Sequence, residues 1–456
     1  MNMQLFDTII APATPPGKGA LAVIRLSGPD TFSSARQCIT PQTSWNNLKA
    51  NRQVLADFYG PDQKLVDRVM VVKFIQPHSF TGEDSLEIYC HGGPFVVQTI
   101  LDRFLDLGVR LAMPGEFTRR AFMNGKIDLL QAEAIHDLIE AKTKNSLQLS
   151  LDQYQGRLSH SLSELTAELR EYAALLELEL DFSEEDLEFV NREQLLQKMD
   201  KIIAPVSSLL DSFEHGKLVN TGINVAIIGK PNVGKSSLLN ALLNEDRALV
   251  TDLAGTTRDS IRESLDIEGQ LYNLIDTAGI RRTKDRLELL GLKKTDQAID
   301  KADLILAVFD QSQPLDTDDR LNLEKISGLT KRVLVVLNKS DQPAQLSADD
   351  FDFQSVSVSA TQLDGLEDLK KSMITAFQMD YDQSYMILIN KPRHRDSLKR
   401  TMNHLNHARE SLVNQLSAEF IAIDIRAALD AIGELTGHIS RDDILNDIFS
   451  HYCIGK

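Results

Sequence analysis

The chain lacks any apolar run of about 18 residues in its 456 residues, so we expect no membrane span. Its first residues include the acidic Asp7 and no basic cluster, which argues against a signal peptide. Cysteine is scarce as well. The three cysteines are odd in number and widely spaced, which is typical of a reduced cytoplasmic protein rather than of a disulfide framework.

Basic residues are also fewer than acidic ones. The chain has 49 Lys and Arg and 66 Asp and Glu, which gives a net charge of −17. Nonspecific nucleic-acid binding over the whole surface is therefore disfavoured, and an RNA site would need a local basic patch. Residues 381–410 hold six basic residues against three acidic ones. An RNA-facing surface and a solvated helix face fit this segment equally well. The six are Lys391, Arg393, Arg395, Lys399, Arg400 and Arg409.

The order of sequence patterns predicts a multidomain α/β protein of about three domains. Short β-rich segments with Gly and Pro between them predict an α+β domain over 1–121. Apolar residues at helical spacing predict helices over 122–217 and again over 381–456. Between them, 218–380 alternates apolar strands with helical stretches, which indicates a doubly wound sheet inserted into one discontinuous helical domain.

A phosphate-binding loop opens the inserted domain, with the run Gly229-Lys-Pro-Asn-Val-Gly-Lys235-Ser236. The glycines let backbone N–H groups face the phosphates, and the following helix adds its positive end. We expect Lys235 to reach the β- and γ-phosphates and the Ser236 hydroxyl to ligate Mg²⁺.

The run Asn338-Lys-Ser-Asp341 identifies the base as guanine. An ionised carboxylate only accepts hydrogen bonds, and guanine offers it two donors where adenine offers none. Asp276-Thr-Ala-Gly279 and Ser359-Ala360 stand in the expected order around it, so the sequence predicts GTP. The predicted GTP contacts are Asn232, Val233, Gly234, Lys235, Ser236, Ser237, Thr251, Asp252, Leu253, Ala254, Gly255, Thr256, Thr257, Asp276, Thr277, Ala278, Gly279, Asn338, Lys339, Asp341, Ser359, Ala360 and Thr361.

Ile280 stands where a Ras-like enzyme has the glutamine that orients the attacking water. An apolar side chain cannot do this, so hydrolysis is very slow or another polar group does it. The residues alone leave the choice open among Arg281, Arg282, Asp285, Arg286 and Glu288. They also leave open which threonine of Gly255-Thr-Thr-Arg-Asp259 completes the Mg²⁺ shell beside Asp276.

Motifs in all three regions carry a resemblance to one family. Over essentially its whole length the chain resembles the tRNA modification GTPase MnmE (TrmE) family. Its motifs are Ala13-Thr-Pro-Pro-Gly-Lys-Gly19, Ser79-Phe-Thr-Gly-Glu-Asp84, His91-Gly-Gly93, Pro114-Gly-Glu-Phe117, Gly255-Thr-Thr-Arg-Asp259 and Cys453-Ile-Gly-Lys456.

This resemblance implies a K⁺-stimulated GTPase that acts as a homodimer with a flavin-dependent partner, MnmG, in a heterotetramer. Together they would add a carboxymethylaminomethyl or aminomethyl group to C5 of the wobble uridine, position 34, of certain tRNAs. The one-carbon unit would come from 5-formyl- or methylene-tetrahydrofolate, bound by the N-terminal domain. A regulatory GTPase switch in ribosome assembly, without modification chemistry, is the alternative that the nucleotide motifs alone leave open.

The resemblance also implies roles for particular residues. Folate would contact Arg25, Glu87, Lys126 and Lys456; K⁺ would be held by Asn232, Thr251, Leu253 and Thr256; Mg²⁺ would be held by Ser236 and Thr257. The implied catalytic residues are Glu288, which orients water, Lys235, Arg258 and Cys453. For Cys453, a structural or merely folate-adjacent role remains an equal alternative to a catalytic thiol, whereas Lys456 makes a prenylation box improbable.

Overall fold

The computed structural model describes residues 7–181, 192–245, 263–275, 296–377, 387–437, 442–450, 452 and 455. Contacts divide the chain into two compact units, each described by itself below. One contains residues 1–136, 153–203 and 397–456, and the other contains 137–152 and 204–396. Within the described ranges, no helix is both long and apolar enough to cross a membrane. The domain boundaries expected from the sequence stay a prediction.

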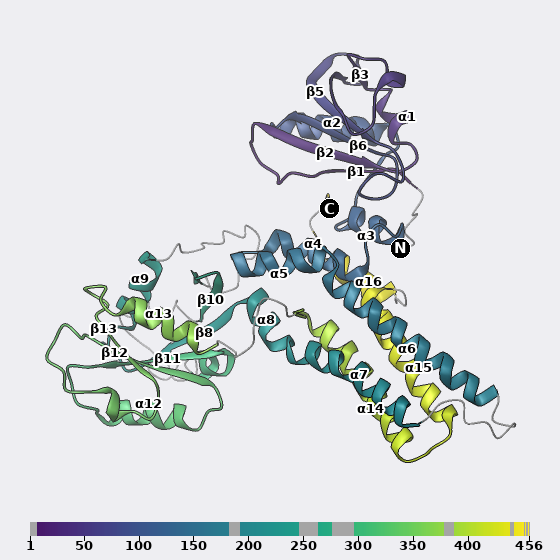
Figure 1. Ribbon diagram of the computed structural model, residues 1–456. Helices are drawn as coiled ribbons and strands as arrows, with labels where there is room; N and C mark the ends of the chain where they lie inside the picture. The colour runs from purple at the N-terminus through teal and green to yellow at the C-terminus, as the bar shows by residue number, and fades with distance from the viewer. Residues whose placement is uncertain are drawn as a thin grey trace. The chain divides into compact units, whose positions relative to one another are not determined.

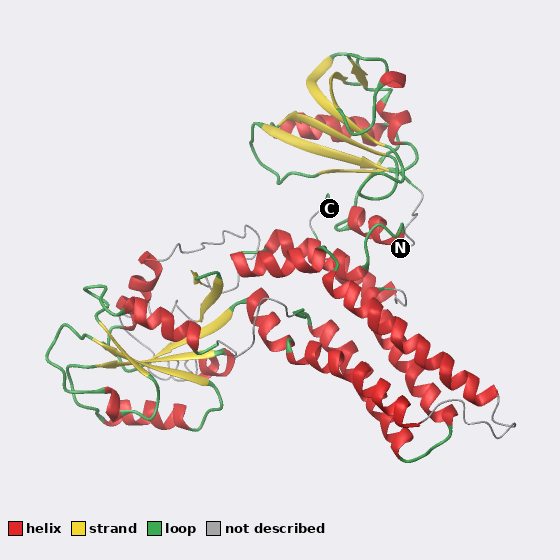
Figure 2. Cartoon of the chain, viewed as in Figure 1, coloured by secondary structure: helices red, strands yellow, loops and turns green. Residues whose placement is uncertain are grey.

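The N-terminal part of the first unit is a seven-stranded sheet with the order β3-β4-β5-β6-β2-β1-β7 (Figures 1 and 2). All neighbouring strands are antiparallel except β1 and β7, which are parallel. The elements are β1 (Ile9–Pro12), β2 (Leu21–Ser27), α1 (Thr31–Ala35), β3 (Ile39–Pro41), a short 3₁₀ turn (Trp45–Asn47), β4 (Gln53–Tyr59), β5 (Leu65–Phe74), β6 (Ser85–His91), α2 (Pro94–Asp106), β7 (Arg110–Leu111) and α3 (Glu116–Met123).

Alternating burial gives this sheet two different faces. In β2, Ala22, Ile24 and Leu26 are buried and pack with Ile100 and Phe104 of α2. Because side chains of a strand alternate between faces, the residues between them lie on the opposite face. The α+β prediction for the N-terminal region therefore agrees with this arrangement, and the alternation decides which polar side chains share the uncovered face.

Helices make up the rest of the first unit and join segments far apart in the sequence. On α6 and α15, which pack side by side (Figure 1), buried side chains recur at three- and four-residue spacing. On α6 they are Leu158, Leu162, Leu165, Leu169, Tyr172 and Leu176; on α15 they are Ile421, Ile425, Ala428, Ile432 and Leu435. The helices that lie wholly or partly in this unit are α4 (Leu129–Glu140), α6 (Arg157–Asp181), α7 (Arg192–Asp211), α14 (Pro392–Val413), α15 (Ala418–Thr436) and α16 (Asp442–Ser450). Of the remaining helices, α5 (Lys144–Tyr154) belongs mostly and α8 (Phe213–Thr221) wholly to the second unit.

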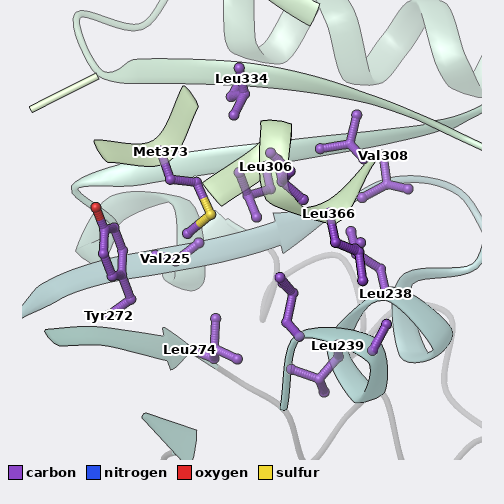
Figure 3. Packing of buried hydrophobic residues seen from close by; sticks show 14 of the residues in the cluster. Val225, Leu238, Leu239, Tyr272, Leu274, Leu306, Val308, Leu334, Leu366 and Met373 are labelled. Carbon is purple, nitrogen blue, oxygen red and sulfur yellow. The ribbon is translucent and has the colours of Figure 1, made fainter. Parts of the chain in front are cut away.

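The second unit contains a six-stranded sheet with the order β13-β12-β11-β8-β10-β9, in which only β9 is antiparallel to its neighbour. Apolar side chains from the strands pack against Leu238, Leu366 and Met373 of the helices (Figure 3). This is the doubly wound sheet expected from the sequence. Its elements are β8 (Ile223–Ile228), α9 (Lys235–Glu245), β9 (Glu263–Ile267), β10 (Gln270–Ile275), β11 (Leu304–Asp310), α12 (Thr317–Ser327), β12 (Arg332–Asn338), a 3₁₀ turn (Ala348–Asp350), β13 (Ser355–Val358) and α13 (Leu366–Thr375).

Candidate functional site

Parallel strands bring three of the predicted nucleotide motifs, those in the described residues, to one edge of the second sheet. The strands β8, β11, β12 and β13 run side by side in parallel. Their last residues are Ile228, Asp310, Asn338 and Val358, and the phosphate loop and Ser359 follow directly on two of them. The carboxyl edge of such a sheet is where doubly wound proteins bind ligands. The described nucleotide residues therefore share one region.

The backbone of the phosphate loop has positive φ at Gly229 (144°), Asn232 (65°) and Gly234 (98°). A Cβ at Gly229 would lie 2.3 Å from the Val308 carbonyl oxygen, and one at Gly234 would lie 2.0 Å from Asn338 Nδ2. Side chains are excluded at both positions by backbone conformation and by contact. The loop can therefore curl closely against β11 and β12.

Lys235 begins α9 and folds back across this loop. Its Nζ donates hydrogen bonds of 2.6 Å to the carbonyl oxygens of Gly229 and Lys230. Burial lowers the pKa of Lys235 from its ordinary value. Ser236 and Ser237 occupy the same first helical turn, where the helix dipole favours negative charge. A cation, two serines of the first helical turn and a helix N-terminus thus follow directly on the loop.

The buried side chain of Asn338 joins three of the predicted motifs. Its Nδ2 donates to the Val233 carbonyl oxygen at 2.7 Å, and its Oδ1 accepts from the Ala360 amide at 3.2 Å. The amide side chain has both a donor and an acceptor, so one residue satisfies both loops. Asn338 therefore holds the phosphate loop and the Ser359-Ala360 loop in a fixed relation.

The residues around Asp341 form a second polar group. Ser359 Oγ donates a 2.6 Å hydrogen bond to Asp341 Oδ1 and lies 3.2 Å from Thr361 Oγ1. Lys339, with φ of 66°, contacts Asp310 Oδ2 through Nζ at 2.5 Å. Burial would raise the pKa of Asp310, but hydrogen bonds from Lys339 and Ser312 outweigh it, so the pKa is lowered.

The role of Lys230 in holding the loop was not predicted from the sequence. Its Nζ lies 2.7 Å from a carboxylate oxygen of both Asp316 and Asp319. Burial alone would lower the pKa of Lys230, yet hydrogen bonds to the two aspartates raise it. The same aspartates form the capping box of α12. Asp316 directly precedes α12 and Asp319 is its third residue, and this spacing, which is typical of a helix N-terminus, could have indicated the anchor.

In the first unit, the structure pairs two of the predicted folate residues on the face of the sheet opposite α2. Arg25 of β2 and Glu87 of β6 are register partners, and Arg25 Nη2 lies 2.8 Å from Glu87 Oε1. Tyr89 donates through its hydroxyl to Glu87 Oε2 at 2.8 Å. The rings of Phe80 and Phe117 lie 5.6 and 5.8 Å from the guanidinium carbon. Phe80 and Phe117 stand in motifs that carry the family resemblance, but the sequence predicted no binding role for these three aromatic residues.

Two further contacts approach this face. Lys126 donates through Nζ to the Pro77 carbonyl oxygen at 3.0 Å, on the loop that also carries Phe80. The buried Gly455 lies so close to Pro12 that a Cβ would come within 2.1 Å of its carbonyl oxygen. Pro12 ends β1, which pairs with the strand of Arg25. Gly455 and the described folate residues Arg25, Glu87 and Lys126 therefore belong to the same unit.

Several predicted residues lie outside the described residues. They include the potassium ligands other than Asn232, the second magnesium ligand, and three of the four catalytic residues. They are Thr251, Asp252, Leu253, Ala254, Gly255, Thr256, Thr257, Arg258, Asp276, Thr277, Ala278, Gly279, Glu288, Cys453 and Lys456.

The basic residues of 387–410 largely contact acids of the chain itself. Lys391 Nζ lies 3.0 Å from Asp137 Oδ1, and Arg409 Nε lies 2.7 Å from Asp200 Oδ1. Arg400 pairs with Glu434. Because these charges are neutralised locally, they offer less to a phosphate backbone than the composition of the segment implies.

The phosphate loop and the Asn-Lys-x-Asp motif at the ends of parallel strands define the class of P-loop GTPases. The family model described as GTP-binding protein TrmE N-terminus matches residues 8–126, and that of the MnmE helical domain matches 129–453. A protein of Thermotoga maritima named tRNA modification GTPase MnmE is 43% identical, over 99% of this chain and 100% of its own length. One of Geobacter sulfurreducens with the same name is 43% identical over the full length of both.

The chain belongs to the MnmE family of tRNA modification GTPases. The resemblance predicted from the sequence is confirmed, and so is the prediction of a GTP-hydrolysing enzyme. Among solved structures, the G domain of the T. maritima FeoB iron transporter is 25% identical, with a TM-score of 0.26. This match covers 34% of the present chain and 99% of the FeoB domain. Era in complex with MgGDPNP and 16S ribosomal RNA nucleotides is also 25% identical, with a TM-score of 0.26. This match covers 40% of the present chain and 66% of the Era chain.

Proposed function

We propose that this chain is a K⁺-stimulated GTPase that works with an MnmG-type flavoprotein on the wobble uridine of certain tRNAs. The pair adds a carboxymethylaminomethyl or aminomethyl group to C5, using the one-carbon unit of a tetrahydrofolate. The proposal further includes a homodimer, a heterotetramer with the flavoprotein and a cytoplasmic location. The observation that carries the GTPase part is the connection that Asn338 makes between the phosphate loop and the Ser359-Ala360 loop.

This connection fixes the distance between the group that reads the base and the groups that hold the phosphates. Asp341 is kept in place by Ser359, and its carboxylate accepts the two donors of guanine. Lys235 already donates two hydrogen bonds across the loop, and an anionic phosphate is a stronger acceptor than those carbonyl oxygens. A preorganised cation at this position stabilises the charge that develops on the transferred phosphoryl group.

The chemistry of the described side chains fits the two metal ions. The Ser236 hydroxyl, directly after Lys235 at the start of α9, suits Mg²⁺, which prefers oxygen ligands. Asn232 has an amide oxygen inside the loop, the type of ligand that discriminates K⁺ by size and coordination number. When bound, K⁺ supplies positive charge near the phosphoryl group. Thr257 for Mg²⁺, and Thr251, Leu253 and Thr256 for K⁺, complete the proposed sets.

For the folate, the proposal rests on the polar group around Arg25. A guanidinium flanked by Phe80 and Phe117 can bind a carboxylate and stack on an aromatic ring. Glu87 and Tyr89 add an acceptor and a hydroxyl, which suit a pteridine rich in donors. Lys126 and Lys456 are the proposed cations for the glutamate tail. Cys453, two positions before Gly455 in the sequence, is the proposed thiol of the reaction centre.

Mass spectrometry of tRNA nucleosides tests the proposal. Cells that lack the protein should lose the modified wobble uridine, and expression of the wild-type chain should restore it. Arg25→Ala should fail to restore it while leaving GTP hydrolysis intact, because Arg25 lies in a different unit from the nucleotide site. Unchanged wobble uridines in the deletion strain would favour a regulatory switch in ribosome assembly.

Base recognition is tested separately with Asp341→Asn. An amide places a donor where xanthine has a carbonyl, so the variant should prefer XTP to GTP. Hydrogen bonds to a charged group contribute about 1.5–3 kcal/mol, which predicts a fall in GTP affinity of roughly 10- to 150-fold. Titration with both nucleotides measures it. Retained preference for GTP would remove Asp341 from this role.

A further inference from the structure

A cluster of two histidines and one aspartate lies on the α14–α15 hairpin, in the first unit. His404 and His407 are one turn apart on α14, and Asp424 lies on α15. One ligand atom from each of the three lies within 4.8 Å of the other two. None of the three belongs to the nucleotide or folate residues described above. The cluster is partly open to solvent, since His407 is exposed.

From this geometry we propose that His404, His407 and Asp424 form a binding site for a divalent transition metal ion of the Zn²⁺ class. Two imidazole nitrogens and one carboxylate oxygen are a ligand set that such ions take, often with water in a remaining position. Mg²⁺ and Ca²⁺ prefer sites made of oxygen ligands, so they are not the expected occupants.

The distances fit this ligand set. His404 Nδ1 and Asp424 Oδ1 are 3.1 Å apart. Neighbouring ligands of a tetrahedral ion with bonds of about 2.0–2.2 Å lie roughly 3.4 Å apart. The imidazole rings of His404 and His407 have centroids 6.5 Å apart and are nearly perpendicular, at 89°. The ligand atoms of all three residues lie within 4.8 Å of one another, and the exposed His407 is the side chain that would adjust when an ion binds.

An ordinary ion pair between the helices does not account for all three residues. Arg400 and Glu434 already form such a pair, joining the same two helices. The hydrogen-bond contact between His404 and Asp424 involves two residues only, and it does not explain why the ligand atom of His407 also lies within 4.8 Å of both. A metal ion held by two imidazole nitrogens and one carboxylate oxygen accounts for all three residues.

Zinc binding to the metal-stripped full-length chain tests the site. The protein is dialysed to equilibrium against micromolar Zn²⁺ in excess Mg²⁺, and the bound zinc is measured by mass spectrometry. The wild type should bind one equivalent more than His407→Ala or Asp424→Asn. Changes to groups that merely support a metal ligand cost about 10- to 100-fold in affinity, so loss of a ligand should cost at least tenfold. Circular dichroism shows whether each variant is folded. If Asp424→Asn is not folded, the test rests on zinc binding by His407→Ala, which changes an exposed side chain.

The chain contains a matched control in His160 of α6. Its Nε2 lies 3.3 Å from Glu164 Oε1, and both side chains are exposed, so it is a histidine–carboxylate pair that lacks a second imidazole. His160→Ala should bind as much zinc as the wild type. The proposal is overturned if His407→Ala keeps wild-type stoichiometry and affinity, or if His160→Ala loses as much zinc as His407→Ala.

Discussion

Replacing Asn338 with alanine should weaken the binding of GTP and GDP together. The side chain is 2% exposed and satisfies the Val233 carbonyl and the Ala360 amide at once. Each buried polar group left without a partner costs about 1–3 kcal/mol, so the change removes on the order of 2–6 kcal/mol from the local structure. Only part of this free-energy cost lowers the affinity for the nucleotide. We expect a loss in nucleotide affinity of at least about tenfold, or about 1.4 kcal/mol.

A second substitution at the same position separates the contributions of the two Asn338 hydrogen bonds. Asn338→Asp keeps an oxygen that can accept from Ala360, but it has no donor for the Val233 carbonyl and places a negative charge beside it. Its defect should therefore be concentrated in the phosphate loop. Loss of the loop geometry should lower the affinity for phosphate-bearing nucleotides more than it lowers the affinity for guanosine.

Fluorescence titration of the full-length chain with a labelled GDP, in Mg²⁺, measures these affinities. Asn224→Ala is the matched control, because Asn224 lies near the other end of β8 and its Nδ2 donates to Asp303 Oδ2 at 3.0 Å. It should lose some stability but no affinity. Wild-type affinity in Asn338→Ala, or an equal loss in Asn224→Ala, would refute the reasoning.

Three further predictions concern other residues. GTP hydrolysis should be faster in K⁺ than in Na⁺, and Asn232→Ala should reduce that difference; equal rates of phosphate release in both salts would contradict it. Glu288→Ala should lower turnover by about 10²-fold or more at near-unchanged nucleotide affinity; loss of turnover in Asp285→Ala but not in Glu288→Ala would move the role to Asp285. Burial raises the pKa of Cys38 to about 12 and of Cys90 to about 11. Both should resist alkylation at pH 8, where their thiolate fractions are roughly 10⁻⁴ and 10⁻³, until the protein is unfolded, as read by peptide mass spectrometry.

In the second sheet the apolar inner strands were predictable from the sequence, and the two more polar edge strands were not. The runs that form β8, β11 and β12 are almost continuously apolar, because helices cover both faces of a parallel sheet. Glu263–Ile267 and Ser355–Val358 form β9 and β13 at the two edges of the sheet, where polar residues are tolerated, and the hydrophobic pattern did not reveal them. Pro205 lies inside α7 without ending it, so the helical reading of that stretch holds despite the proline.

The motifs predicted what the site contains, but not what holds it together. Gly229, Lys235 and Asp341 could be named from spacing, because phosphate and guanine recognition require those residue types in that order. The hydrogen bond from Asn338 to Val233 spans 105 positions, and the pair of Arg25 with Glu87 spans 62. Such contacts depend on strand register, which local patterns do not encode.

The packing of α15 on α6 has a consequence for the synthesis of the chain. Helix α6 ends at Asp181, and its buried stripe of leucines meets α15, which begins at Ala418. The ribosome must therefore make about 240 more residues, which takes roughly 10–50 s at typical rates, before synthesis of the partner helix begins. During that interval the apolar face of α6 has no native cover from α15. We expect the nascent chain to be a chaperone client at this stage, while the inserted nucleotide domain folds ahead of the helices that flank it.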